Sequence, residues 1–149
     1  MLAIRPLAMI FGVAGLTPFL AALVLLIFSS DHSAFATQLF YLYSAGILAF
    51  LSGVYWPVSM QIGEHSYPLS PIHAMFLSQV FFVSAGLTLL LDWSLQALIF
   101  PILYILLWLT DWYAMAGYWP RWYLNLRLLL TTGVVACQVA AATWLRPVV

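Results

Sequence analysis

The stretch LSGVYWPVSM, residues 51–60, lies in a longer segment, Phe35–Gly63, that contains no charged side chain. In water, Gly53 and Pro57 would together interrupt a helix. In hydrocarbon a helix tolerates both, because unpaired backbone groups cost more there and neighbouring helices support the bend. Since Gly53 has no side chain, it also relieves the crowding that the Pro57 ring causes at its carbonyl. The stretch predicts a bent membrane helix that ends at an interfacial indole, Trp56.

The composition of the whole chain also indicates a membrane protein. Of 149 residues, 66% are hydrophobic and 5% are charged, and the mean hydropathy is +1.08. A soluble domain needs about a quarter of its residues charged to solvate its surface, so the lipid bilayer is the expected surrounding. The formal net charge is zero and the four arginines are scattered. This excludes a phosphate-binding patch, and no nucleic acid partner is expected.

Five apolar runs are each long enough to cross a bilayer, which takes about 20 helical residues. The expected spans are residues 6–28, 37–62, 71–91, 94–112 and 123–145. The first run is too long for the apolar part of a signal peptide and is interpreted as a retained span. Prolines at positions 18, 57 and 101 predict bends in spans one, two and four. The sequence therefore predicts an all-α integral membrane bundle of five transmembrane helices, in a single domain over residues 1–149.

The arginines suggest an orientation. With five spans, Arg5, Arg121 and Arg127 share one membrane face and Arg146 lies on the other. Because cytoplasmic loops are enriched in Lys and Arg, we expect a cytoplasmic N-terminus and a C-terminus on the opposite face. The expected location is the bacterial inner membrane, or the mitochondrial inner membrane for relatives.

Ionisable groups within spans are functional candidates by default. Arg127 lies inside the fifth span, and Asp111 ends the fourth. The connection between these spans makes them antiparallel neighbours, so Asp111 and Arg127 are candidates for a structural or functional ion pair. Two alternatives remain open: Arg127 reaches lipid phosphates, or it handles a substrate or proton.

Aromatic and small side chains suggest contact surfaces. The connection from span four to span five is rich in aromatic residues, typical of an interfacial belt but also compatible with a docking surface: Trp112, Tyr113, Tyr118, Trp119, Trp122 and Tyr123. Two rows of small residues allow close helix approach, either within the bundle or in a homo-oligomer: Ala45, Ala49 and Gly53, and Gly133, Cys137 and Ala141.

The sequence contains no recognised metal or catalytic motif. A soft copper(I) site at His65, His73, Met60 and Met75 is conceivable, but their spacing matches no metal motif. Cys137 is the single cysteine and is interpreted as a packing residue. No Ser-His-Asp, His-Glu-x-x-His or paired-carboxylate pattern occurs. No cofactor is therefore predicted, and catalysis lacks support.

Three blocks resemble a family of small polytopic membrane proteins of unknown function, found in bacteria and mitochondria, that includes human transmembrane protein sixty-nine. The blocks are GVAGLTPFLAALVLL at 12–26, YSAGILAFLSGVYWP at 43–57 and PRWYLNLRLLLT at 120–131. The resemblance implies a membrane fold but no activity. Tyr55 and Pro57 depart from it, because the family favours His and Gly there. The matching positions are Gly15, Pro18, Phe19, Ile47, Leu48, Phe50, Leu51, Gly53, Trp56, Asp111, Trp122, Tyr123, Leu126, Arg127 and Thr131.

Three functional hypotheses follow. The small size, short loops and aromatic rim favour a non-enzymatic accessory or assembly subunit of an inner-membrane complex, for example a respiratory one, with a membrane-protein partner or a second copy bound. A second hypothesis is a small transporter or channel, suggested by bent spans and by six polar residues: Gln38, Gln79, Thr88, Asp111, Arg127 and Gln138. A third and weaker one is a membrane enzyme acting on lipid or quinone head groups near Asp111 and Arg127.

Overall fold

The computed structural model describes residues 4–63 and 67–145, and all regular structure in these two segments is helical. In chain order the elements are α1 (Ile4–Ala14), α2 (Thr17–Phe28), α3 (Ser33–Gly53), α4 (Tyr55–Gln61), α5 (Pro71–Thr88), α6 (Trp93–Leu109), the π-helical turn η1 (Thr110–Ala114) and α7 (Arg121–Trp144).

These elements form five helical rods that are long and apolar enough to cross a membrane. They cover Ile4–Phe28, Ser33–Gln61, Pro71–Thr88, Trp93–Ala114 and Arg121–Trp144. The expected all-α bundle with five spans is confirmed. The length and apolar composition of these helices are those of an integral membrane protein. The second rod begins at Ser33, four residues before the expected start, because the polar turn ahead of it is short.

The first two rods are interrupted where glycine and proline lie close together. α1 ends at Ala14, and α2 restarts with Pro18 in its first turn. The Tyr43 hydroxyl donates a hydrogen bond of 2.9 Å to the carbonyl of Gly15 and so supports this break from α3. α3 ends at Gly53, and α4 carries Pro57. α6 instead continues through Pro101 as one helix, and the irregular turn of the fourth rod comes later, at η1.

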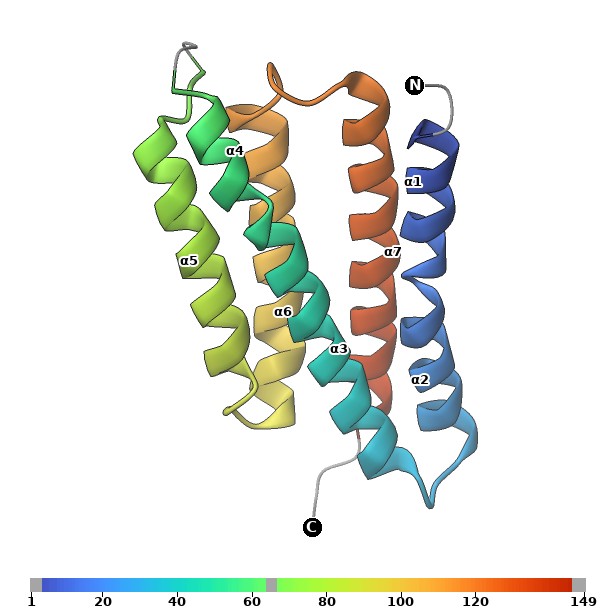
Figure 1. The fold of residues 1–149 in the computed structure, drawn as a ribbon. Helices are drawn as coiled ribbons and strands as arrows, with labels where there is room; N and C mark the ends of the chain where they lie inside the picture. The colour runs from blue at the N-terminus through green and yellow to red at the C-terminus, as the bar shows by residue number, and fades with distance from the viewer. Residues whose placement is uncertain (1–3, 64–66, 146–149) are drawn as a thin grey trace.

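The inclination of α3 decides where the bundle is tight and where it is open. Figure 1 shows α3 crossing the bundle diagonally, from beside α2 at one end to α4 beside α5 at the other. α2 packs on α3, α4 packs on α5, and α1 packs mainly on α7. At the end that carries the N-terminus, α3 has therefore moved away from α1. A cavity lies between α1, α3 and α7.

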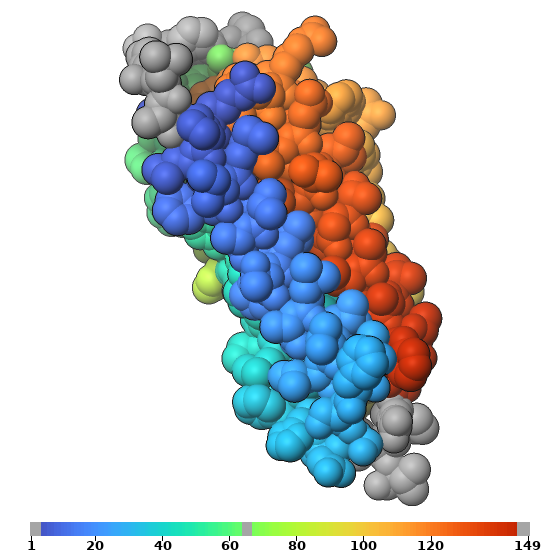
Figure 2. Space-filling model, turned by 90° about the vertical axis from the view of Figure 1, so that its right-hand side faces the viewer, coloured from blue at the N-terminus to red at the C-terminus, as the bar shows by residue number. Residues whose placement is uncertain are grey.

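Glycines bring the first rod close to α7. A Cβ added at Gly12 would lie 2.9 Å from the Leu130 side chain, and one at Gly133 would lie 3.1 Å from Leu16. Figure 2 shows the first rod lying along α7 over its whole length. Such small residues allow the close backbone approach that helix packing in membranes requires.

Candidate functional site

Asp111 lies in η1, between the last regular turn of α6 and the connection to α7. The five-residue turn widens the helix, and the N–H of Met115 donates to the carbonyl of Thr110 at 3.2 Å. π-helical turns are rare and often occur at functional positions, because the added residue redirects a side chain. Here Asp111 is 1% exposed and lies inside the bundle.

The Asp111 carboxylate accepts hydrogen bonds from three side chains. Its Oδ2 accepts from Arg127 Nε at 2.7 Å and from Arg127 Nη2 at 2.5 Å. Its Oδ1 accepts from Trp119 Nε1 at 3.1 Å and from the Tyr55 hydroxyl. Four hydrogen bonds match the capacity of a carboxylate. Asp111 thus joins α4, η1, the connection before α7, and α7 itself.

The chemistry of this network favours a structural role. Arg127 is 4% exposed, so both charges of the pair are withdrawn from water and lipid. A buried pair is stable only when its remaining hydrogen-bonding capacity is satisfied, and removing one partner leaves the other charge unpaired. Since Asp111 already accepts from three donors, it has little capacity left to act as a general base. We expect it to hold the helices in place.

A cavity of about 570 Å³ lies beside this network, between the first rod, α3 and α7. Apolar side chains form most of its wall, while Arg127, Tyr123 and Thr131 contribute polar groups from α7. The volume falls within the range of small-molecule sites in proteins. Arg127 thus contacts Asp111 on one side and the cavity on the other.

The family model described as "Protein of unknown function (DUF3429)" matches residues 4–143. The chain belongs to the DUF3429 family. The expected membership in a family without an assigned function is confirmed, while the relation to human transmembrane protein sixty-nine stays a prediction. No curated protein and no solved structure matches the chain. Function in this DUF3429 protein must therefore be argued from its own geometry.

Tyr55 and Trp119 are the members of the network that the sequence does not reveal as partners of Asp111. Tyr55 is separated from Asp111 by 56 residues, and the contact depends on how α4 is inclined. The available signal is the expected departure from the family pattern, since the resemblance implies histidine at this position and both side chains can donate a hydrogen bond. Trp119 appears in the sequence only as one of six clustered aromatic residues.

The residues that carry the family resemblance lie partly on exposed surface and partly at the cavity. Gly53 and Trp56 lie on exposed surface near the α3–α4 break, and Trp122 is half-buried at the start of α7. Pro18 is exposed in the first turn of α2. Nine others line the cavity: Gly15, Phe19, Ile47, Phe50, Leu51, Tyr123, Leu126, Arg127 and Thr131.

Three of the four candidate metal ligands lie within the described residues, and His65 lies outside them. His73 forms a hydrogen bond of 2.5 Å with Ser70 at the start of α5, Met60 is exposed on α4, and Met75 lines a groove on the outer surface. Among residues 4–63 and 67–145, no three His, Cys, Asp or Glu side chains gather as metal ligands would.

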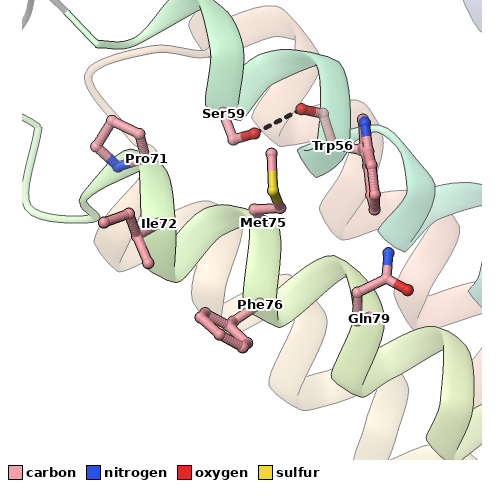
Figure 3. Close-up of a pocket in the computed structure, with 7 residues that line it drawn as sticks. All are labelled: Trp56, Ser59, Pro71, Ile72, Met75, Phe76 and Gln79. Carbon is pink, nitrogen blue, oxygen red and sulfur yellow. Dashed lines mark hydrogen bonds between the residues drawn. The ribbon is translucent and has the colours of Figure 1, made fainter.

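Another concave feature is an outer groove between α4 and α5. It has a volume of about 320 Å³. Figure 3 shows Trp56 and Ser59 on the α4 side, facing Met75, Phe76 and Gln79 on α5. Ser59 is occupied by a hydrogen bond of 2.6 Å to the carbonyl of Trp56. The side-chain amide of Gln79 is exposed at the surface of the bundle.

Proposed function

We propose that this DUF3429 chain is a non-enzymatic membrane subunit that docks on another integral membrane protein through the groove between α4 and α5. The observation that carries the proposal is the position of Gln79. This side chain is exposed on the outside of the bundle, and within the described part of the chain it makes no hydrogen bond.

The depth of Gln79 makes its exposure costly in a bilayer. α5 begins at Pro71, so Gln79 lies roughly 12 Å along the helix at 1.5 Å per residue. The hydrocarbon core is about 30 Å thick, which places the amide well inside it when α5 crosses the membrane. An unpaired amide in hydrocarbon costs about 4–8 kcal/mol on the cyclohexane scale. A hydrogen bond from a neighbouring helix would offset part of this cost.

The shape of the groove fits a helix of a partner protein. Ile72, Phe76 and Met75 provide an apolar floor on α5, and Trp56 forms the opposite wall. The Trp56 indole also makes no hydrogen bond among the described residues and is 45% exposed. A transmembrane helix with a polar side chain among small residues would fill the groove and pair with the Gln79 amide.

The polar groups inside the bundle support a role without catalysis. Asp111 and Arg127 are joined to each other and to Tyr55 and Trp119, which stabilises the packing of α4 and α7. The polar residues that suggested a transporter are distributed over different faces: Gln38 and Gln79 are exposed, whereas Thr88 and Gln138 are buried. This distribution supports docking more than passage of a solute.

The proposed location is the inner membrane, within a complex such as a respiratory one, with the N-terminus in the cytoplasm. Arg5 and the first residue of α7, Arg121, lie at the same end of the bundle (Figure 1). Arg127 is paired and buried, so it contributes less to the charge rule than the sequence suggests. Arg146 lies outside the described residues.

Purification from native membranes in lipid nanodiscs, with quantitative mass spectrometry, tests the proposal. We expect one membrane protein in stoichiometric amount with the unmodified chain. Gln79→Leu should lower its recovery roughly three- to thirtyfold, the effect of losing one hydrogen bond of 0.6–2 kcal/mol between membrane helices. Gln38→Leu is the matched control. It should retain the partner, because Gln38 is also an exposed glutamine but lies near the start of α3 and does not line the groove. Equal recovery with both variants, or the absence of a stoichiometric partner, would contradict docking at the groove.

A further inference from the structure

The cavity beside Arg127 is a built feature of the fold. Glycine contacts hold the first rod against α7 on one side, at Gly12 and Gly133. On the other side α3 leans away, and the hydrogen bond from Tyr43 to the Gly15 carbonyl fixes the break between α1 and α2. The space of about 570 Å³ lies between these elements.

The wall of the cavity is apolar over most of its length. Along the first rod it extends from Ala8 to Phe19, which is roughly 16 Å at the helical rise. Ile47 and Leu51 of α3 and Val134 of α7 form other parts of the wall. A cavity of this size and lining in a membrane protein suits a hydrocarbon chain, because it offers the same apolar surroundings as the lipid.

Polar groups that lack partners occur on the α7 wall. Arg127 uses Nε and Nη2 for Asp111, while its Nη1 makes no hydrogen bond to any described residue. The same holds for the Tyr123 hydroxyl and the Thr131 hydroxyl. None of the three atoms is fully enclosed, in contrast to the enclosed and unpaired hydroxyl of Tyr41. Since all three residues line the cavity, these atoms can bond to a molecule that occupies it.

The charge balance of the network restricts the kind of ligand. Arg127 is already neutralised by Asp111 at hydrogen-bond distance. A carboxylate or phosphate in the cavity would add a second negative charge to a buried pair, and a buried charge without its own partner is strongly unfavourable. An uncharged oxygen such as a carbonyl would accept from Nη1 and from the hydroxyls without this cost.

We propose that the cavity binds an uncharged amphiphile that consists of a long hydrocarbon chain with a carbonyl head. The chain lies along α1 and α3, and the carbonyl oxygen accepts hydrogen bonds from Arg127 and Tyr123. A prenyl quinone and an acylglycerol ester both have this chemistry. The site is separate from the groove between α4 and α5 and does not depend on the partner proposed there.

Photolabelling of the full chain in maltoside micelles tests the site, since this detergent has no carbonyl group. The probe is a diacylglycerol that carries a diazirine in its acyl chain. The competitors are decylubiquinone, dioleoylglycerol and oleate. Saturable labelling that decylubiquinone or dioleoylglycerol displaces at lower concentration than oleate supports the proposal. The more effective of the two uncharged competitors identifies the source of the ligand.

Two matched pairs of variants locate the ligand. Ala8→Phe fills the cavity and should remove saturable labelling, whereas Ala14→Phe changes an exposed residue of the same helix and should not. Tyr123→Phe should weaken binding roughly three- to tenfold through the loss of one hydrogen bond, while Tyr113→Phe, which is exposed, should have no effect. The proposal is overturned by non-saturable labelling, by preferential displacement with oleate, by equal labelling of Ala8→Phe and Ala14→Phe, or by unchanged binding in Tyr123→Phe.

Discussion

At the scale of single residues, Asp111 organises one end of the bundle. Its two oxygens accept from Arg127, Tyr55 and Trp119, and each donor comes from a different segment of the chain. The Asp111–Arg127 contact follows from the antiparallel arrangement of spans four and five and could be expected from the sequence. The other two contacts could not, because they depend on the π-helical turn and on the direction of α4 after its break.

A double-mutant cycle measures the coupling of the ion pair. Asp111→Asn leaves Arg127 charged and buried, so it should lower the free energy of unfolding by about 3–5 kcal/mol. Arg127→Gln should have an effect of similar size. The double variant, which replaces the charges by two amides, should lose less than the sum of the single effects. Unfolding in SDS of the reconstituted protein is the measurement, and strict additivity would show that the two residues do not act as a pair.

Position 55 offers a second test at this scale. Tyr55→Phe removes one donor to Asp111 and should destabilise the protein by about 1–3 kcal/mol, since the acceptor is buried and charged. Tyr55→His, the residue that the family resemblance implies here, should recover part of this loss through its ring N–H. The same unfolding assay compares the two variants. A histidine variant that is less stable than the phenylalanine variant would argue against a hydrogen-bonding role for this position.

At the scale of helices, close approach depends on a few glycines, while other glycines face open space. The row at Gly133, Cys137 and Ala141 packs inside the bundle, where Cys137 and Ala141 are buried. The row at Ala45, Ala49 and Gly53 runs from a buried residue to an exposed one. Their spacing in the sequence is similar, so the sequence could not distinguish an internal face from an outer one.

The same substitution at two glycines tests this distinction. Gly133→Leu would force a side chain against Leu16 and should lower the free energy of unfolding by about 1–3 kcal/mol through overpacking. Gly46→Leu lies in α3, where no described atom comes within 4 Å of an added Cβ, so it should leave stability unchanged or raise it by up to about 1 kcal/mol. Comparable destabilisation of the two variants would contradict the described packing of the first rod on α7.

At the scale of the whole molecule, hydropathy and length were sufficient to predict five spans. Backbone groups in lipid must be paired within a segment, so long apolar runs have one common solution, the helix. The inclination of α3 could not be predicted in this way. Side chains of similar hydropathy lie on all its faces, so the sequence does not indicate which face packs against which neighbour. The cavity beside Arg127 and the groove at Gln79 depend on how the helices are placed against one another, and neither could be located from the sequence.

The orientation of the molecule is a further prediction. The N-terminus is expected in the cytoplasm and the C-terminus on the opposite face. Reporter fusions at the C-terminus test this: alkaline phosphatase, which is active outside the cytoplasm, should be active, and green fluorescent protein should be dark. A control fusion after Gln61, the last residue of the second rod, is expected in the cytoplasm. There, alkaline phosphatase should be inactive and green fluorescent protein should fluoresce. A fluorescent C-terminal fusion would contradict the orientation.

Site-specific photo-crosslinking in cells tests whether another membrane protein occupies the groove between α4 and α5, as we propose. A photoreactive phenylalanine at position 76, where Phe76 is 67% exposed in the groove, should form one discrete adduct with a different membrane protein. The same group at position 35, where Phe35 is 56% exposed at the start of α3, should not. Adducts only with lipid, or only with a second copy of this chain, would show that no other membrane protein docks there.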